Sequence, residues 1–153
     1  MHTVEIDQSG RIDQTDRPTV LALADGTSYS IYLSSKTKRE CLIRLREQHR
    51  FQSSKKLYVL LFATLLYFLL IDKIAELDLA IVDTELLGLD AQIKEHTINL
   101  LRRKGVSVYP DMLTFRQIGK NSPAHHLAWR VFRGLAQPDK VLTAIEILAE
   151  LGK

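Results

Sequence analysis

The chain has 153 residues, of which 46% are hydrophobic and 25% are charged. This composition is typical of a folded globular protein and excludes the disordered and fibrous classes. The length suits one domain, 1–153, with a core of its own. The one cysteine, Cys41, cannot form an internal disulfide, and the first residues lack the pattern of a secretory signal peptide. We therefore expect a single cytoplasmic domain.

Charge alternates along the chain in blocks, although the net charge is only +3. Residues 1–34 contain two basic and five acidic side chains, and residues 35–56 contain eight basic and two acidic ones. Residues 72–95 contain two basic and seven acidic side chains, and residues 96–153 contain nine basic and four acidic ones. Carboxylates beside basic surfaces are what a metal site facing a phosphate backbone requires. Each block taken alone is more simply a solvated face.

Three strands are predicted first, over residues 3–7, 19–24 and 27–33. Their apolar residues alternate or run continuously, as in half-buried and buried strands. Asp25-Gly26 separates the second strand from the third, and this pair favours a tight hairpin because its residues tolerate positive φ. The three strands should form an antiparallel meander.

A first helix is predicted to begin near residue 37, because Thr37 and Glu40 have the spacing of a capping box. A long apolar helical segment follows at about 53–76, and its stretch 57–71 contains no charged residue. That stretch is short for a membrane span and typical of a buried core helix. A helix that is apolar all round must be covered on several sides, so we expect a homodimer through 57–71 and consider membrane insertion unlikely.

The rest of the chain alternates strands and helices. The predicted elements are a buried strand 79–82 ending in Asp83, a helix 91–104 capped by Asp90, a strand 112–118, a helix from Ser122-Pro123 to about Arg133, and a helix of about 139–151. Strands reached through helices are joined in parallel by right-handed crossovers. We therefore predict an α/β fold with a mixed five-stranded sheet, three antiparallel strands followed by two parallel ones, and helices on both faces.

This order of elements, with acids at chosen places, resembles the ribonuclease H-like superfamily. Residues 4–10 (VEIDQSG) resemble the first strand of that family, residues 38–40 (KRE) its first helix, and residues 79–83 (LAIVD) its fourth strand. The resemblance implies that Asp7, Glu40 and Asp83 are ligands of Mg²⁺ or Mn²⁺. Residues 124–128 (AHHLA) resemble the helix that carries a fourth site residue, usually Asp, and the matching position here is His125.

Neighbouring strands lie about 4.8 Å apart, so Asp7 and Asp83 would share one small volume in this topology. Two such carboxylates need a shared proton or a cation between them, and Glu40 would add a third oxygen donor of the kind that Mg²⁺ and Mn²⁺ prefer. Two cations at such a site cleave phosphodiester bonds by activating water and stabilising the leaving oxygen. His125 would act as a ligand or in proton transfer. Glu5 and Glu85 are further candidate ligands.

Plainer roles exist for the same residues. The two aspartates could make Asx turns at strand ends, Glu40 could serve only in a capping box, and the histidines could be ordinary polar residues of a helix. Joint placement of the acids in one topology favours a site over these separate explanations.

Basic residues near the predicted site would contact substrate phosphates, which positions a nucleic acid without reading its sequence. These residues are Lys36, Lys38, Arg39, Arg116, Lys120, Arg130 and Arg133. The chain lacks an aromatic-rich platform, zinc-finger spacing, a P-loop and a GxGxxG motif, so several other nucleotide-binding classes lose support.

The sequence therefore predicts a metal-dependent nuclease acting on RNA, an RNA/DNA hybrid or structured DNA. The alternative is a catalytically inactive domain of the same fold that serves as a binding or assembly module and forms a homodimer. The histidine in place of the usual fourth acid favours this alternative. A protein attached to a membrane by 57–71 is a third, minor interpretation.

Overall fold

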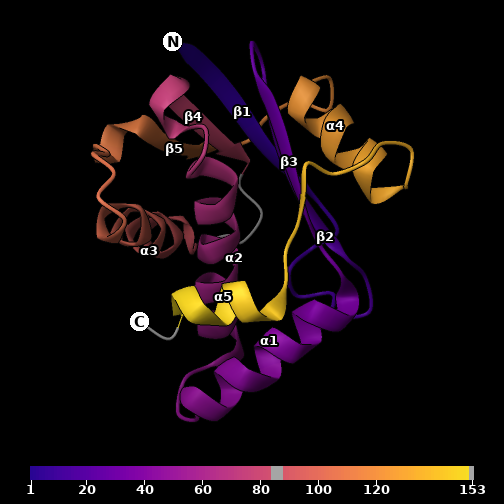
Figure 1. Cartoon of the computed structure of the whole chain (residues 1–153), viewed down its shortest axis with the longest axis vertical. Helices are drawn as coiled ribbons and strands as arrows, with labels where there is room; N and C mark the ends of the chain where they lie inside the picture. The colour runs from indigo at the N-terminus through magenta and orange to yellow at the C-terminus, as the bar shows by residue number, and fades with distance from the viewer. Residues whose placement is uncertain (84–87, 152–153) are drawn as a thin grey trace.

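A computed structural model of the protein describes residues 1–83 and 88–151. It has an α/β architecture built on one mixed six-stranded sheet with helices on both faces (Figure 1). The strands are β1 (His2–Ser9), β2 (Thr19–Ala24), β3 (Ser28–Leu33), β4 (Leu77–Asp83), β5 (Leu113–Arg116) and β6 (Lys140–Val141). The helices are α1 (Ser35–Gln48), α2 (Ser54–Leu70), α3 (Asp90–Arg103), α4 (Pro123–Phe132) and α5 (Ala144–Leu151).

The sheet has the strand order β5-β4-β1-β2-β3-β6. β1, β2 and β3 pair as the expected antiparallel meander, whereas β4 pairs in parallel with β1 on one side and with β5 on the other. Asp25 and Gly26 both have positive φ, at 121° and 81°. The hairpin between β2 and β3 has three loop residues, because Ala24 pairs with Ser28 and the Asp25 amide donates to the Thr27 carbonyl at 3.1 Å.

A sixth strand, β6, was not expected from the sequence, which predicts a helix from about residue 139. Asp139 is instead held beside β3. Its carboxylate accepts from the Ser30 amide at 2.8 Å, and its own amide donates to the Ser30 carbonyl at 3.0 Å. Helix α5 starts only after Thr143, whose hydroxyl accepts from the Glu146 amide while the Glu146 carboxylate accepts from the Thr143 amide. This reciprocal capping box fixes the start of the helix.

Helix α2 accounts for the long apolar segment. It lies behind α5 at the centre of the view in Figure 1 and is packed by α1, α3 and α5 and by strands β2 and β3. Eleven of its residues are buried, including Leu65 at 1% exposure. Because the chain itself covers this helix, the reason for expecting a dimer through 57–71 no longer applies. Within the described residues, no helix is both long enough and apolar enough to cross a membrane.

The two faces of the sheet have different cores. The larger core lies between the sheet and the α2 group of helices and includes Val4 and Ile6 of β1 and Val82 of β4. The smaller core lies between the sheet and α4, where Val20 and Ala22 of β2 meet Ala128 and Val131 of α4. Figure 1 shows α4 alone on its side of the sheet, at the upper right.

The start of α1 differs from the expected one. The N-cap is Ser34, whose hydroxyl accepts from the Thr37 amide at 3.1 Å, rather than Thr37 itself. The helix thus begins one turn earlier than the Thr37-to-Glu40 spacing predicts. Glu40 is therefore not the N3 residue of the helix.

Candidate functional site

Asp7 and Asp83 lie on adjacent parallel strands and face the same side of the sheet. Ile6 of β1 is in register with Val82 of β4, so the next residue on each strand is an aspartate. Ile6 and Val82 both point into the larger core. Because successive side chains alternate between faces, both aspartates point to the opposite face, toward α4. The strand periodicity thus brings together two acids that are far apart in the chain.

The Asp7 carboxylate is buried, with 5% of the residue exposed. Its Oδ1 accepts from the Gln8 amide at 2.8 Å, and its Oδ2 is 2.7 Å from His125 Nδ1. Burial raises the pKa of Asp7, and the nearby Asp83 charge raises it further, whereas the hydrogen bonds from His125 and Gln8 oppose these effects. The net effect disfavours the charged form of Asp7.

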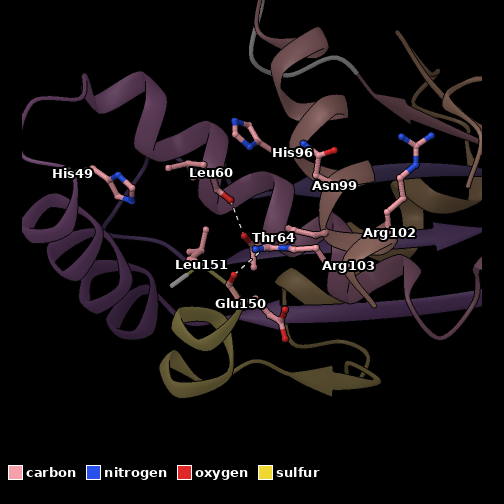
Figure 2. A pocket seen from close by; sticks show the side chains of 10 residues that line it. His49, Leu60, Thr64, His96, Asn99, Arg102, Arg103, Glu150 and Leu151 are labelled. Atoms are coloured by element: carbon pink, nitrogen blue, oxygen red, sulfur yellow. Dashed lines mark hydrogen bonds between the residues drawn. The ribbon is translucent and has the colours of Figure 1, made fainter. Parts of the chain in front are cut away.

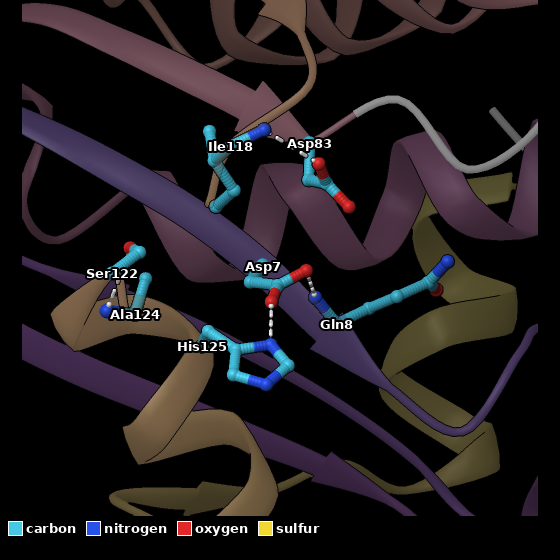
Figure 3. Close-up of polar contacts among 7 residues, drawn as sticks. All are labelled: Asp7, Gln8, Asp83, Ile118, Ser122, Ala124 and His125. Atoms are coloured by element: carbon cyan, nitrogen blue, oxygen red, sulfur yellow. Dashed lines mark hydrogen bonds and ion pairs between the residues drawn. The ribbon is translucent and has the colours of Figure 1, made fainter. Parts of the chain in front are cut away.

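Asp83 ends β4 and is held by the segment that follows β5. Its Oδ1 accepts from the Ile118 amide at 2.9 Å, and its neighbour across the parallel pair is Arg116. Figure 3 shows Asp83 above Asp7, with Ile118 on one side and His125 below. One backbone amide on each aspartate fixes its orientation and leaves lone pairs for another ligand.

His125 reaches the site because of how α4 begins. Ser122 is the N-cap, its hydroxyl accepts from the Ala124 amide at 3.2 Å, and Pro123 follows at the first helical position, as the sequence predicts. Ala124 and Ala128 are fully buried, which places His125 on the flank of the helix beside Asp7. With Asp7 ionised, Nδ1 carries the proton and donates it in this bond, and Nε2 becomes the acceptor. Nε2 points away from Asp7 in Figure 3.

These side chains line a cavity of about 340 Å³. The lining residues are Asp7, Gln8, Asp83, Gln117, Ile118, Lys120 and His125. Two carboxylates, an imidazole and one exposed lysine thus face the same space. Such a set can bind a cation together with an anionic group such as a phosphate.

Gln8 and Gln117 are members of this site that the sequence reasoning did not include. Gln8 is 8% exposed, and within the described part of the chain its side-chain oxygen and nitrogen have no hydrogen-bond partner. Because Gln8 follows Asp7 on the strand, its side chain leads away from the Asp7 carboxylate (Figure 3), and its contact with that carboxylate is made by the backbone amide. Its position directly after Asp7 on β1 is the feature that could have identified it.

Glu40 is not brought to Asp7 and Asp83. It is an exposed residue of α1, a helix that packs with α2 and α5 on the other face of the sheet (Figure 1). The inward side of α1 is formed by Cys41 and Leu45, both fully buried. Glu40, which precedes Cys41, lies on the exposed side of the helix. Burial raises the pKa of the Cys41 thiol to about 12, which fits a structural cysteine rather than a nucleophile.

Lys38 is fully buried and does not present its charge to a substrate. Its Nζ donates to the carbonyls of Arg11, Gln14 and Arg17, at 3.1, 2.9 and 2.8 Å. Burial lowers its pKa to about 8, although Asp13 and Asp16 oppose the shift. Lys38 thus ties the loop between β1 and β2 to α1, which is a structural role in place of the expected phosphate contact.

The other predicted phosphate contacts fall into two groups. Arg116, Lys120, Arg130 and Arg133 are exposed on β5, on the segment after it, and on and just after α4, which is the side of the aspartates. Lys36 and Arg39 are exposed on α1, on the other side of the sheet, and Arg39 donates to the Thr15 carbonyl at 2.9 Å. Only the first group is placed to accompany a substrate at the cavity.

The donor set fits one divalent cation more directly than two. Asp7 and Asp83 supply carboxylate oxygens, the ligand type of Mg²⁺ and Mn²⁺, whereas Nδ1 of His125 is already bonded to Asp7. Among residues 1–83 and 88–151, no group of three or more His, Cys, Asp or Glu side chains is arranged to hold a metal ion. Glu5 is not on the cavity wall, and Glu85 lies outside the described residues.

A larger cavity, of about 680 Å³, lies on the other side of the sheet between α2, α3, α5 and the end of α1 (Figure 2). Its polar groups serve the fold. Arg103 donates to the Glu150 carbonyl at 3.3 Å, and Lys56 lies 2.8 Å from His96 Nε2. Burial, together with the Lys56 charge, lowers the pKa of His96, and because an ammonium group can only donate, Nε2 is the acceptor in this contact. Among the described residues that line this cavity, the one carboxylate side chain is that of Glu150.

Comparison with known proteins gives no match to a protein-family model and none to a curated protein. The residues that bear on function are therefore Asp7, Asp83 and His125, which meet at one cavity.

Proposed function

We propose that this protein is a divalent-metal-dependent nuclease with a ribonuclease H-like fold, which hydrolyses phosphodiester bonds in RNA, an RNA/DNA hybrid or structured DNA. The observation that carries the proposal is the placement of Asp7 and Asp83 side by side on β1 and β4, facing one cavity. The order of the five strands β3-β2-β1-β4-β5, which agrees with the resemblance of the sequence, supports the same assignment.

Asp7 and Asp83 would hold Mg²⁺ or Mn²⁺, the cofactor implied by their oxygen donors. When bound, such a cation lowers the pKa of water and offsets charge on a phosphate oxygen. Asp7 keeps His125 oriented through Nδ1, which leaves Nε2 free to accept a proton from an attacking water or to pass one to the leaving oxygen. Lys120, exposed at the cavity, would pair with a substrate phosphate.

Cleavage assays on labelled single-stranded RNA, RNA/DNA hybrid and branched DNA, in Mg²⁺ or Mn²⁺ and in EDTA, test this proposal. Asp7→Asn and Asp83→Asn should each abolish cleavage while the circular dichroism spectrum stays unchanged. Asp78→Asn is the matched control, because Asp78 is an exposed carboxylate on the same strand as Asp83. Cleavage that survives in both site variants would refute the assigned site.

A second candidate is an inactive domain of the same fold that binds or assembles, as a homodimer, without cleaving. It is favoured by the position of Glu40 on the far side of the sheet, because the described residues then give the cavity two carboxylates, those of Asp7 and Asp83. A dimer of this kind would use a surface other than the enclosed helix α2. Cleavage in the presence of Mg²⁺ or Mn²⁺ distinguishes the two candidates, because an inactive module cleaves none of the substrates. Its self-association is measured separately by sedimentation.

A further inference from the structure

The outer face of α4 carries an unusual set of side chains. His126, Trp129, Arg130 and Arg133 are all exposed and follow one another at i, i+3, i+4 and i+7, so they form one stripe along the helix. The opposite side of the helix is the buried side, formed by Ala124, Ala128 and Val131. We call the four exposed residues the α4 stripe.

Trp129 is the one tryptophan of the chain, and it is 45% exposed. The core between α4 and the sheet is formed by smaller residues and does not include Trp129. The guanidinium carbon of Arg133 lies 5.7 Å from the centre of the indole ring, within the range of a cation–π contact. The ring is therefore presented on the surface beside a cationic group instead of being used for packing.

The stretch of chain that carries the α4 stripe has charges of one sign. Between Asp111 and Asp139 the sequence contains no Asp or Glu, and its charged residues are Arg116, Lys120, Arg130 and Arg133. All four are exposed. A surface with four cations in one uninterrupted stretch is complementary to a polyanion.

The α4 stripe is continuous with the candidate site. His125, which bonds to Asp7, and Trp129 are four residues apart on the same helix, about 6 Å along its axis. Lys120, on the cavity wall, lies just before the same helix. A chain of phosphates passing over the stripe would thus lead to Asp7 and Asp83.

We propose that the α4 stripe binds an unpaired nucleic-acid strand, with a base stacked on Trp129 and phosphates paired with Arg130 and Arg133. This inference rests on the proposed nuclease function and assigns its substrate class. Base stacking on an exposed aromatic ring beside cations is the usual way of holding single strands. Bases inside a duplex are already stacked, so they do not offer a face to Trp129.

The single tryptophan makes a direct binding measurement possible. The Asp7→Asn protein, in EDTA to prevent cleavage, is titrated with a 12-nucleotide oligo-dT or oligo-U while Trp129 fluorescence is followed. Strong quenching is expected with the single strands and weak quenching with a blunt duplex of equal length. Adding salt should weaken binding, because phosphate contacts release counterions.

Variants test the contribution of each side chain by the anisotropy of a labelled oligonucleotide. Trp129→Ala should weaken single-strand binding about tenfold or more, and Trp129→Phe should keep most of it, since one stacked base contributes on this scale. Arg130→Gln and Arg133→Gln should each lower the slope of log affinity against log salt by about 0.7. Arg44→Gln, an exposed arginine on α1 across the sheet, is the control and should leave the affinity unchanged.

Absence of quenching, equal affinity for the duplex, or unchanged affinity of Trp129→Ala would each overturn the inference. If Trp129→Ala instead dissociated an oligomer of the protein without affecting the oligonucleotide, the stripe would be a protein interface and the inference would be wrong. These results are separate from the nuclease test. Binding lost in Trp129→Ala but without metal-dependent cleavage supports the stripe and rejects the nuclease, whereas cleavage with no role for Trp129 does the reverse.

Discussion

Asp7 Oδ2 and His125 Nδ1 lie 2.7 Å apart, although 118 positions separate the two residues in the chain. The carboxylate is 5% exposed at its side chain and the imidazole 36%. The pair thus joins a buried acid on β1 to a ring at the mouth of the cavity. It fixes the imidazole so that its second nitrogen faces away from Asp7 (Figure 3), as a group that transfers protons requires.

The raised pKa of Asp7 makes a prediction about stability and pH. Below the ordinary value of 3.8, Asp7 is protonated in both the folded and the unfolded state. As pH rises above it, the unfolded state loses this proton first, so the folded state binds more protons and the free energy of unfolding falls. The fall ends once pH passes the folded pKa.

Urea unfolding of the wild-type protein and Asp7→Asn across pH 3.5 to 8 measures this effect, in about half-unit steps. The stability of the wild-type protein relative to Asp7→Asn should decline from about pH 4 and then level off. Mg²⁺ or Mn²⁺ should restore part of it at the higher pH, because a ligand that binds only the folded state stabilises that state. A difference that stays constant with pH, or rises, would contradict the assigned burial effect.

Replacing His125 should change both Asp7 and the reaction. The hydrogen bond from His125 lowers the pKa of Asp7, so His125→Ala should raise that pKa further, as measured by carboxyl ¹³C NMR titration. If Nε2 transfers the proton, cleavage should slow by about 10²- to 10⁴-fold and lose one limb of its pH profile. His49→Ala, at the end of α1 on the other side of the sheet, should change neither the pKa of Asp7 nor the rate of cleavage.

The positions of Asp7 and Asp83 at the ends of strands could be predicted from the sequence, because a strand is recognised from its own residues. Each acid follows an apolar residue of a recognisable strand, and the connecting helices require β1 and β4 to be parallel. That β1 and β4 are neighbours, which brings the two acids together, was expected only from the resemblance to the ribonuclease H-like topology. The Asp-Gly hairpin and the Ser122-Pro123 helix start were predictable from the sequence, since their residue types have local conformational preferences.

Glu40 and Lys38 could not be placed in this way. Ser34 and Thr37 both suit an N-cap, so the sequence leaves the first turn of the helix open. The buried side of α1 is formed by Lys38, Cys41 and Leu45, whereas the apolar residue Ile43 is 60% exposed, so hydrophobicity alone does not identify the inner face. Lys38 is fully buried because three carbonyls of a distant loop surround its ammonium group, which is a tertiary arrangement without a pattern in the sequence. A strand of two residues is too short to show a periodic pattern, so the sequence does not predict β6. The Thr143-to-Glu146 capping box nevertheless marks the start of α5.

The three carbonyl contacts of Lys38 predict a large effect on stability. Lys38→Met keeps the aliphatic part of the side chain but removes the donor from the carbonyls of Arg11, Gln14 and Arg17. The Arg11 and Gln14 carbonyls also accept from the Gln14 and Arg17 amides, so the Arg17 carbonyl is the acceptor that is left without a described partner. An unpaired buried acceptor costs about 1 to 3 kcal/mol, so urea unfolding should show a loss of about that size. Lys36→Met, exposed on the same helix, should change stability by less than about 0.5 kcal/mol. Equal effects of the two changes would argue against a structural role for Lys38.

The enclosed position of α2 makes a final prediction about both stability and association. Leu65 is 1% exposed within a helix packed by α1, α3 and α5, so Leu65→Ala should lower the free energy of unfolding by about 2 to 5 kcal/mol. Ile145→Ala, 85% exposed on α5, is the control and should have little effect. Because Leu65 faces the interior of its own chain, its replacement should leave the sedimentation coefficient of the folded protein unchanged. Conversion of a dimer to a folded monomer by Leu65→Ala would instead place α2 at an interface between two copies.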